Sequence, residues 1–212
     1  MAEPARLHTA RREHLAPRFG APGRDPANLS HLGIQRVVEA ASRKGVALDI
    51  RLMAGWARTA EETAVAVHAE LGQIVNSIVL VAPRPEGRLI PIVFLVSGRN
   101  QVDLGLLAAV TGESSVRRAT ARETTELTGY SAGGIPPFGH GRDVRVVMDQ
   151  DLCQYQSVWA AAGTDAAVFQ IAPRTLRMLC NAVVAPLAQA SLVRRAGLQF
   201  EPRLQCGAGT GA

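Results

Sequence analysis

Residues 128–140, Thr-Gly-Tyr-Ser-Ala-Gly-Gly-Ile-Pro-Pro-Phe-Gly-His, restrict the backbone more than any other part of this sequence. They hold four glycines and two prolines in thirteen residues, between a helical pattern and a strand pattern. Gly129 stops the helix, because glycine adopts at little cost the left-handed conformation that ends helices. The pair Gly133-Gly134, followed by the fixed φ of Pro136, predicts a rigid loop whose N–H groups point together into a cleft. Gly/Pro clusters are ordinarily turns, but the length of this one favours a functional loop.

Helical and strand patterns alternate along the rest of the chain. Helical spacing of apolar residues predicts helices at 30–44, 59–72, 102–110, 121–127 and 174–184, with a helical turn at 149–155. Strand patterns cover 46–53, 73–81, 89–96, 116–119, 144–148, 157–161 and 167–171. Ser30, Thr59 and Thr120 are the expected N-caps, Glu62 completes a capping box, and Pro173 is an expected N1 residue. This order predicts an α/β fold with a mixed sheet rather than a doubly wound Rossmann fold.

One domain flanked by two extensions is expected. Residues 1–28 mix Arg, Pro, Gly and Ala without periodicity, which predicts a flexible basic extension. The predicted domain covers 29–184, and periodicity fades over 185–212, which predicts a disordered tail. No apolar run reaches the roughly 18 residues that span a bilayer, and the N-terminus lacks the apolar region of a secretory signal. We therefore expect a cytoplasmic protein without a membrane partner.

The charge distribution argues against a duplex-binding surface. The formal charge is +5, but residues 30–182 carry fifteen basic against fourteen acidic side chains, so the surplus lies in the two ends. Such a body is not expected to wrap DNA, although contact with the end of a nucleic acid fits it. Three cysteines far apart in the sequence make no zinc-binding spacing, so no metal site is predicted.

Two adjacent polar residues, Asn76 and Ser77, interrupt the strongly apolar strand pattern at 73–81. Neighbouring residues of a strand point to opposite faces, so one of the two faces the interior if the sheet is covered on both sides. A buried amide or hydroxyl needs a hydrogen-bond partner or a ligand. This pair is therefore a candidate binding element.

Several pieces, in order over residues 31–181, resemble the YbaK/EbsC family, the free-standing relatives of the editing domain inserted in bacterial prolyl-tRNA synthetases. They are the helix start Thr59-Ala60-Glu61-Glu62, the strand 73–79, the turn Ser97-Gly98, the loop 128–140 and the segments 149–152, 158–164 and 167–169. Each piece is weak alone, but the ordered series is specific.

The resemblance implies a single compact, barrel-like α/β domain with flanking helices, and a hydrolase without metal or cofactor. Members of the family remove a wrong amino acid from the acceptor end of a mischarged tRNA, outside the synthetase. A loop of the pattern Gly-x-x-x-Pro contacts the aminoacyl ester through its backbone, and the ribose 2′-hydroxyl of the substrate activates water. Carried onto this sequence, the catalytic set is Asn76, Gly133, Gly134 and Ile135. The substrate-binding set is Ser77, Ser97, Gly98, Gly129, Tyr130, Pro136 and His140.

One family element is missing. Members usually have Lys-Ser or Lys-Thr where this chain has Asn76-Ser77, and Lys44, the only lysine in the sequence, lies in the first predicted helix. A lysine offers a positive charge to an oxygen, whereas Asn offers a neutral amide. The chain is then either a deacylase with altered positioning and specificity, or a module that binds aminoacyl-tRNA without efficient chemistry. A third alternative is hydrolysis of a small ester or amide unrelated to tRNA. The oligomeric state is left open.

Several of these residues also have structural alternatives. His140 could contact the terminal adenosine or a phosphate, or instead bond the backbone of the loop. Asn76 could orient the aminoacyl group or be a satisfied buried amide. Structural roles are expected more often than binding roles for Ser77 and Ser97, and packing more often than base stacking for Tyr130.

Overall fold

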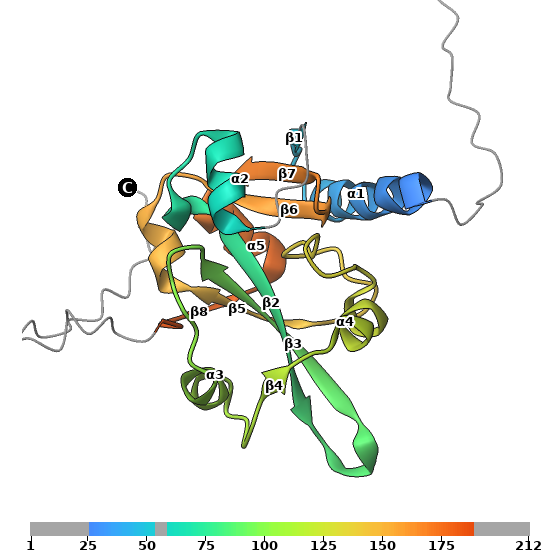
Figure 1. The fold of residues 1–212 in the computed structure, drawn as a ribbon, viewed down its shortest axis with the longest axis vertical. Coiled ribbons are helices and arrows are strands. Elements are labelled where there is room, and N and C mark those ends of the chain that lie inside the picture. Colours follow the sequence, from blue (N-terminus) through green and yellow to red (C-terminus); the bar gives the residue numbers. More distant parts are fainter. Residues whose placement is uncertain (1–25, 54–58, 189–212) are drawn as a thin grey trace, which may run out of the picture.

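The structure is a computed structural model and describes residues 26–53 and 59–188 of the 212-residue chain. Its helices are α1 (Pro26–Ser42), α2 (Ala60–Val67), α3 (Leu104–Thr111), α4 (Ala121–Thr128) and α5 (Pro173–Cys180), as Figure 1 shows. Its strands are β1 (Ile50–Leu52), β2 (Val75–Pro83), β3 (Leu89–Ser97), β4 (Arg117–Arg118), β5 (Arg145–Asp149), β6 (Val158–Thr164), β7 (Ala167–Ile171) and β8 (Val183–Ala185). Short 3₁₀ helices cover Leu71–Gln73, Pro85–Gly87 and Gln150–Gln154.

The strands form two sheets, which confirms the predicted α/β fold on a mixed sheet. The larger sheet has the order β4-β2-β3-β5-β8, with β2 antiparallel to β3 and β4, and β5 parallel to β3 and β8. The smaller sheet has the order β1-β7-β6 and is antiparallel throughout. The sheets approach each other where Ile74 and Trp159 form a parallel bridge, but they do not close into a barrel.

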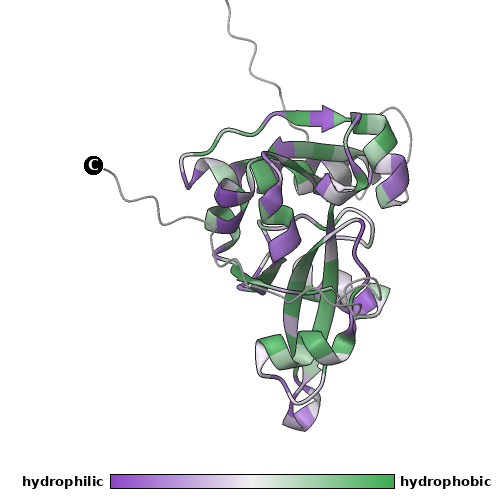
Figure 2. Ribbon diagram, turned by 90° about the vertical axis from the view of Figure 1, so that its left-hand side faces the viewer, coloured by the Kyte–Doolittle hydropathy of each residue, from purple (hydrophilic) through white to green (hydrophobic). Residues whose placement is uncertain are grey.

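The larger sheet is covered on both faces, because the residues of β2 and β3 are apolar on both sides. Val75, Val79 and Leu95 face a core shared with α1, α5 and the smaller sheet. Leu80 and Phe94 face a second core that includes Leu107 of α3 and Leu187. Figure 2 shows the result as green central strands, while most helices are green on one side and purple on the other. Any polar side chain in this part of β2 therefore lies beside a core.

The helix caps follow the predicted chemistry. Thr59 and Glu62 form a capping box at the start of α2, and Thr120 and Glu123 form another at the start of α4. Gly129 ends α4 with φ of 81°, as the sequence predicted. The prediction that α2 extends to residue 72 was wrong, because His68 adopts the left-handed conformation with φ of 56°.

Three other predicted boundaries differ from the structure. α1 begins at Pro26, so Ser30 lies inside the helix and is not its N-cap. The strand predicted at 46–53 pairs with β7 only over β1, although Val46, Leu48 and Ile50 do pack on the core. The helix predicted at 174–184 ends at Cys180, because Asn181 is left-handed with φ of 49°, and β8 follows.

The described chain extends slightly past the predicted domain at both ends. Leu187 is fully buried, and Ala188 bridges Val102, so the fold continues beyond residue 184. Residues 1–25 of the predicted extension and 189–212 of the predicted tail lie outside the described part of the chain. The division into 1–28, 29–184 and 185–212 stays a prediction.

Candidate active site

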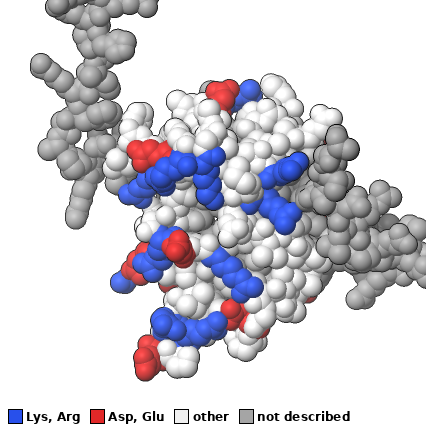
Figure 3. Space-filling model, turned by 180° about the vertical axis from the view of Figure 1, so that it is seen from behind, with Lys and Arg blue, Asp and Glu red and all other residues white. Residues whose placement is uncertain are grey.

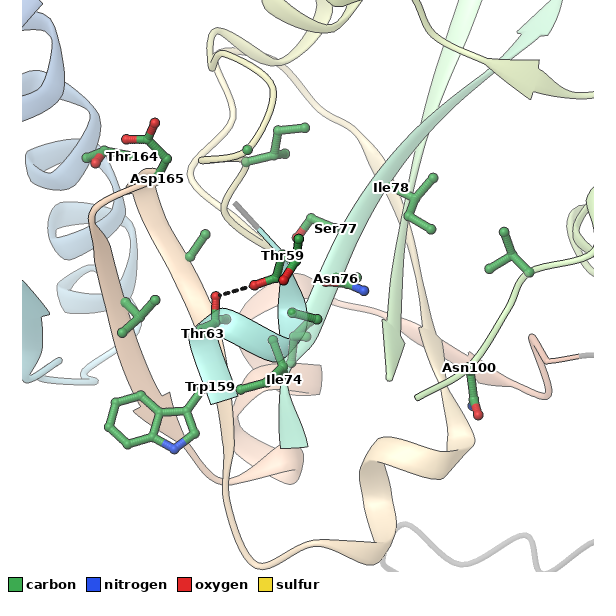
Figure 4. A pocket seen from close by; sticks show the side chains of 18 of the residues that line it. Thr59, Thr63, Ile74, Asn76, Ser77, Ile78, Asn100, Trp159, Thr164 and Asp165 are labelled. Carbon is green, nitrogen blue, oxygen red and sulfur yellow. Dashed lines mark hydrogen bonds between the residues drawn. The ribbon is translucent and has the colours of Figure 1, made fainter. Parts of the chain in front are cut away.

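A cavity of about 590 Å³ lies between the edge of β2, the start of α2, the loop 128–140 and the smaller sheet. Of the predicted site residues, Asn76, Ser77, Gly133 and Ile135 line it together. Figure 4 shows this arrangement, with the β2 residues on one side and the β6–β7 hairpin on the other. Residues that the sequence analysis did not assign to the site also line it: Thr59, Thr63, Ile74, Arg118, Trp159, Thr164 and Asp165.

The hydroxyl of Ser77 is buried in the wall of this cavity. Its Oγ has no hydrogen-bond partner within the described chain. Among the described residues, it is the one buried side-chain nitrogen or oxygen atom without a partner. Ser77 pairs with Leu95 of β3 and shares the strand face of Val75 and Val79. Because an unsatisfied buried hydroxyl costs free energy, it marks a place where a ligand can supply the missing bond.

The main chain of Ser77 points to an unpaired stretch of the β2 edge. β4 pairs with β2 only at Leu80 and Val81, and the Ala119 N–H donates to the Val79 carbonyl at 3.0 Å. Hydrogen-bonding directions alternate along a strand, so the N–H and C=O of Ser77 point to the same edge as those of Val79. β4 does not reach that far. An extended acyl group can therefore meet main-chain donors and acceptors at this edge.

Two loop residues that line this cavity have main-chain N–H groups without a partner in the described parts of the chain. Neither the Gly133 nor the Ile135 N–H donates to any residue in the described parts of the chain, and both residues line the cavity. Gly133 has φ of 95°, a conformation that glycine adopts without strain. By contrast, the Gly134 N–H is used within the loop, where it donates to the Ser131 carbonyl at 3.3 Å.

Gly134 instead lets the loop approach the β6–β7 hairpin. A Cβ atom there would lie 2.5 Å from Cα of Thr164 and 2.9 Å from the N atom of Asp165. Both neighbours are backbone atoms, so a side chain would push the loop away from the hairpin. Gly134 therefore positions Gly133 and Ile135 rather than lining the cavity itself.

The remaining predicted loop residues hold the loop in place and do not line the cavity. Tyr130 is buried and its hydroxyl donates to the Gly139 carbonyl at 2.8 Å; burial raises its pKa to about 12. His140 packs edge-on against the Tyr130 ring, and its Nε2 lies 2.9 Å from the Pro136 carbonyl. Because a carbonyl only accepts, His140 Nε2 carries the proton, and burial lowers the pKa of the ring. Gly129 accepts a hydrogen bond from Arg36 at 3.4 Å.

Ser97 and Gly98 support the start of β2 from the end of β3. Ser97 is fully buried and its hydroxyl donates to the Gly72 carbonyl at 2.8 Å. The Gly98 N–H donates to the Ile74 carbonyl at 2.8 Å, and a Cβ atom at Gly98 would lie 2.5 Å from the Leu71 carbonyl oxygen. Neither residue lines the cavity. Their contacts fix the strand that carries Asn76 and Ser77.

Asn76 lies on the opposite face of β2 from Ser77, as Figure 4 shows. Its side chain is partly exposed and makes no hydrogen bond with another described residue. On this side the cavity wall includes Asn100, whose amide is already bonded to Asp149 and Asp151 at 2.7 and 3.0 Å. The Asn76 amide is thus available to a ligand at the cavity mouth.

The cavity can hold an acyl group and an oxygen that gains negative charge. Its donors are main-chain N–H groups and hydroxyls, which stabilise an oxyanion when they are fixed in advance. Its described lining contains one carboxylate, Asp165, and neither histidine nor cysteine. No group of three or more His, Cys, Asp or Glu side chains in the described chain could hold a metal ion.

Comparison with known families now identifies the chain. The sequence model of the aminoacyl-tRNA editing domain family matches residues 54–179, which include β2, the loop and both cavity-lining strands of the smaller sheet. The chain belongs to this family. The YbaK/EbsC resemblance predicted from the sequence is confirmed.

Two named proteins are similar to this editing domain in sequence. EbsC of Enterococcus faecalis, a candidate Cys-tRNA(Pro)/Cys-tRNA(Cys) deacylase, is 26% identical over 123 residues, covering 58% of this chain and 73% of EbsC. A proline–tRNA ligase of Limosilactobacillus fermentum is 29% identical over 96 residues, which are 45% of this chain and 17% of the ligase. The editing domain therefore has relatives both as a separate protein and within a synthetase.

Solved structures show the same fold. A candidate trans-editing enzyme for prolyl-tRNA synthetase is 41% identical, with a TM-score of 0.68, and the match covers 74% of this chain and 97% of that protein. A hypothetical protein named APE2540 is 26% identical with a TM-score of 0.65, covering 73% and 99% of the two chains. These matches place the editing-domain fold over most of the described residues.

The face of the editing domain seen in Figure 3 is not continuously basic. In the view of Figure 3, Lys and Arg side chains stand in separate groups, with Asp or Glu beside several of them. Arg84, Arg117 and Arg122, for example, form ion pairs with Glu113, Glu123 and Glu126 at 2.7 Å. Among the described helices, none has the length and apolar character needed to cross a membrane.

Proposed function

We propose that this protein is an aminoacyl-tRNA deacylase that acts in trans and hydrolyses the ester of a small amino acid attached to the wrong tRNA. The family, whose domains edit aminoacyl-tRNA, supports the reaction class. The observation that carries the assignment to this cavity is the pair of unpartnered N–H groups at Gly133 and Ile135 beside the unpartnered hydroxyl of Ser77. No cofactor or metal takes part in the proposed reaction.

In this mechanism the ester carbonyl oxygen accepts hydrogen bonds from the Gly133 and Ile135 N–H groups. Negative charge develops on that oxygen as water attacks, and one fixed donor stabilises such a transition state by about 3 kcal/mol. In the described lining no hydroxyl is hydrogen-bonded to a base, so the ribose 2′-hydroxyl next to the ester is the proposed activator of water. Ser77 holds the substrate at the β2 edge, through its hydroxyl and its main chain.

The amino acid side chain would rest against the apolar part of the cavity. Ile74, Trp159 and Ala160 line this part, and all three are nearly completely buried. An apolar wall selects by excluding larger side chains, and a difference of one methylene is worth about 1–3 kcal/mol. A separate editing site is useful because a synthetase faces the same limit in its own pocket.

A second candidate function is a module that binds aminoacyl-tRNA without efficient turnover. The observation that favours it is Asn76, a neutral amide that lines the cavity at the position where the YbaK/EbsC resemblance implies a lysine. Deacylation of a panel of mischarged tRNAs by wild type and by Asn76→Lys separates the two. We expect wild type to release an amino acid from at least one tRNA. Activity in the lysine variant alone would favour the binding module, and turnover of small activated esters without competition from tRNA would favour a general esterase.

The loop itself is tested by Gly134→Ala. The added methyl group would lie 2.5 Å from the Thr164 backbone and displace the loop, so we expect deacylation to fall by about 100-fold or more. Gly141→Ala is the matched control, because a Cβ atom there meets nothing within 4 Å and the residue does not need a positive φ. Full activity in Gly134→Ala, with an unfolding temperature equal to that of the control, would reject the role of the loop amides.

A further inference from the structure

We propose that Arg118 supplies the positive charge that Asn76 lacks, by binding a phosphodiester of the tRNA acceptor end at the mouth of the cavity. This inference rests on the proposed function, because it assigns one contact of that substrate. In this proposal the positive charge that binds the phosphate lies on β4, whereas the family resemblance implies a lysine on β2.

The register of β4 places Arg118 on the same face of the sheet as Asn76. Arg118 lies directly opposite Leu80 of β2, and cross-strand partners of an antiparallel pair share a face. Leu80 and Asn76 are four residues apart on one strand, so they also share that face. Arg118 and Asn76 both line the cavity, and Arg118 is the only basic side chain in its described lining.

The Arg118 guanidinium is not engaged elsewhere in the described part of the protein. Its neighbour Arg117 points to the other face and is held by Glu123 through two hydrogen bonds of 2.8 and 2.7 Å. Arg118 has no such ion pair or side-chain hydrogen bond among the described residues, and it is exposed. A guanidinium with five free N–H donors at the rim of a cavity is available to an incoming anion.

The chemistry of guanidinium favours phosphate as that anion. Its planar fork binds two oxygens of a phosphate at once, and it stays protonated at all relevant pH values. The loop amides and Ser77 are assigned to the acyl end of the substrate, so the group reaching the rim belongs to the terminal nucleotides. Because the body of the protein is nearly neutral, one such contact would contribute a large share of the charge-dependent binding.

The first test measures binding without catalysis. The probe is a single-stranded RNA ending in cytidine-cytidine-adenosine, titrated at several salt concentrations with wild type, Arg118→Gln, Arg118→Lys and Arg117→Gln. We expect Arg118→Gln to bind about tenfold more weakly and to lower the slope of log K against log salt by about 0.7. Arg118→Lys should keep the slope, and Arg117→Gln should match wild type, since exposed ion pairs contribute little. Equal losses in the two glutamine variants would overturn the inference.

The second test asks whether a charge on β2 replaces the charge on β4. In deacylation of mischarged tRNA, Arg118→Gln should raise KM about tenfold with little change in kcat, and Arg118→Gln combined with Asn76→Lys should restore KM. If the lysine does not restore KM although all variants are folded, the inference that Arg118 supplies the charge that Asn76 lacks is refuted. Wild type that releases no amino acid from any tRNA would instead refute the proposed function, while the binding test still decides whether Arg118 contacts RNA.

Discussion

Replacing Ser77 by alanine should make the folded protein more stable and the deacylase less active. In the structure the Ser77 Oγ is buried without a partner in the described chain, so the substitution removes an unsatisfied polar atom and breaks no hydrogen bond. Ser97, at the end of the adjacent strand β3, is the matched control: it is fully buried, but its hydroxyl donates to the Gly72 carbonyl at 2.8 Å.

The expected magnitudes follow from these two environments. A buried hydroxyl without a partner costs about 1–3 kcal/mol, and alanine gives up only the dispersion contacts of one oxygen atom. We therefore expect Ser77→Ala to raise the free energy of unfolding by about 1 kcal/mol, or the unfolding temperature by about 2–4 °C. Ser97→Ala should lower the free energy of unfolding by about 1–3 kcal/mol, because the buried Gly72 carbonyl loses its partner.

Thermal and urea unfolding of the two variants and wild type measure these changes, and deacylation of a mischarged tRNA measures the activity. If Ser77 binds substrate, Ser77→Ala loses about tenfold in kcat/KM while its stability rises. Destabilisation of Ser77→Ala to the same extent as Ser97→Ala would show that the hydroxyl is already satisfied in the free protein. That result would refute the reasoning that a ligand completes its hydrogen bonding.

Two further predictions concern the supports of the site. Burial lowers the pKa of His140 below its ordinary value of 6.5, so its contribution to stability is complete above pH 6.5 and is lost as the pH falls from 6.5 toward the lowered pKa. His140→Gln should remove this pH dependence of the free energy of unfolding, measured with urea between pH 5 and 8. Lys44 donates to two carbonyls in the last turn of α5, at 2.8 Å to Leu179 and 3.3 Å to Met178, so Lys44→Met should lower the free energy of unfolding by about 1 kcal/mol. Its deacylation rate should equal that of wild type, and a large loss of kcat would show that the only lysine of the chain has a catalytic role.

The sequence predicted most of the framework, because the deciding interactions are local. Thr59 and Glu62, three residues apart, form their capping box without help from the rest of the fold, and Gly129 ends α4 through its own φ. Two of the wrong boundaries, the ends of the helices predicted at 59–72 and 174–184, arose where a residue other than glycine took a positive φ. His68 and Asn181 are such residues, and side-chain periodicity carries no signal for them.

The candidate site was harder to predict, because its roles depend on contacts between distant segments. The loop was recognisable from its glycines, but the near contact of Gly134 with Thr164 exists only once the β6–β7 hairpin is folded. Arg118 lies in a strand of two residues, too short for alternation to show which of Arg117 and Arg118 faces the cavity. The polar pair in β2 was a second local signal, and both of its residues line the candidate cavity.

In the proposed function, that pair lets one strand contact both the acyl group and the terminal nucleotide of the substrate. Ser77 shares the strand face that packs on the core containing Ile135 of the loop and Ala160, which suits the acyl group. Asn76 faces the side that Arg118 shares through its pairing opposite Leu80, which suits the nucleotide. Because the side chains of these neighbouring residues point to opposite faces of the sheet, a change at position 76 can alter nucleotide binding while the acyl site stays intact. In the proposed arrangement a neutral residue at position 76 leaves the acyl site unchanged, and Arg118 on β4 sets how strongly the RNA end is held.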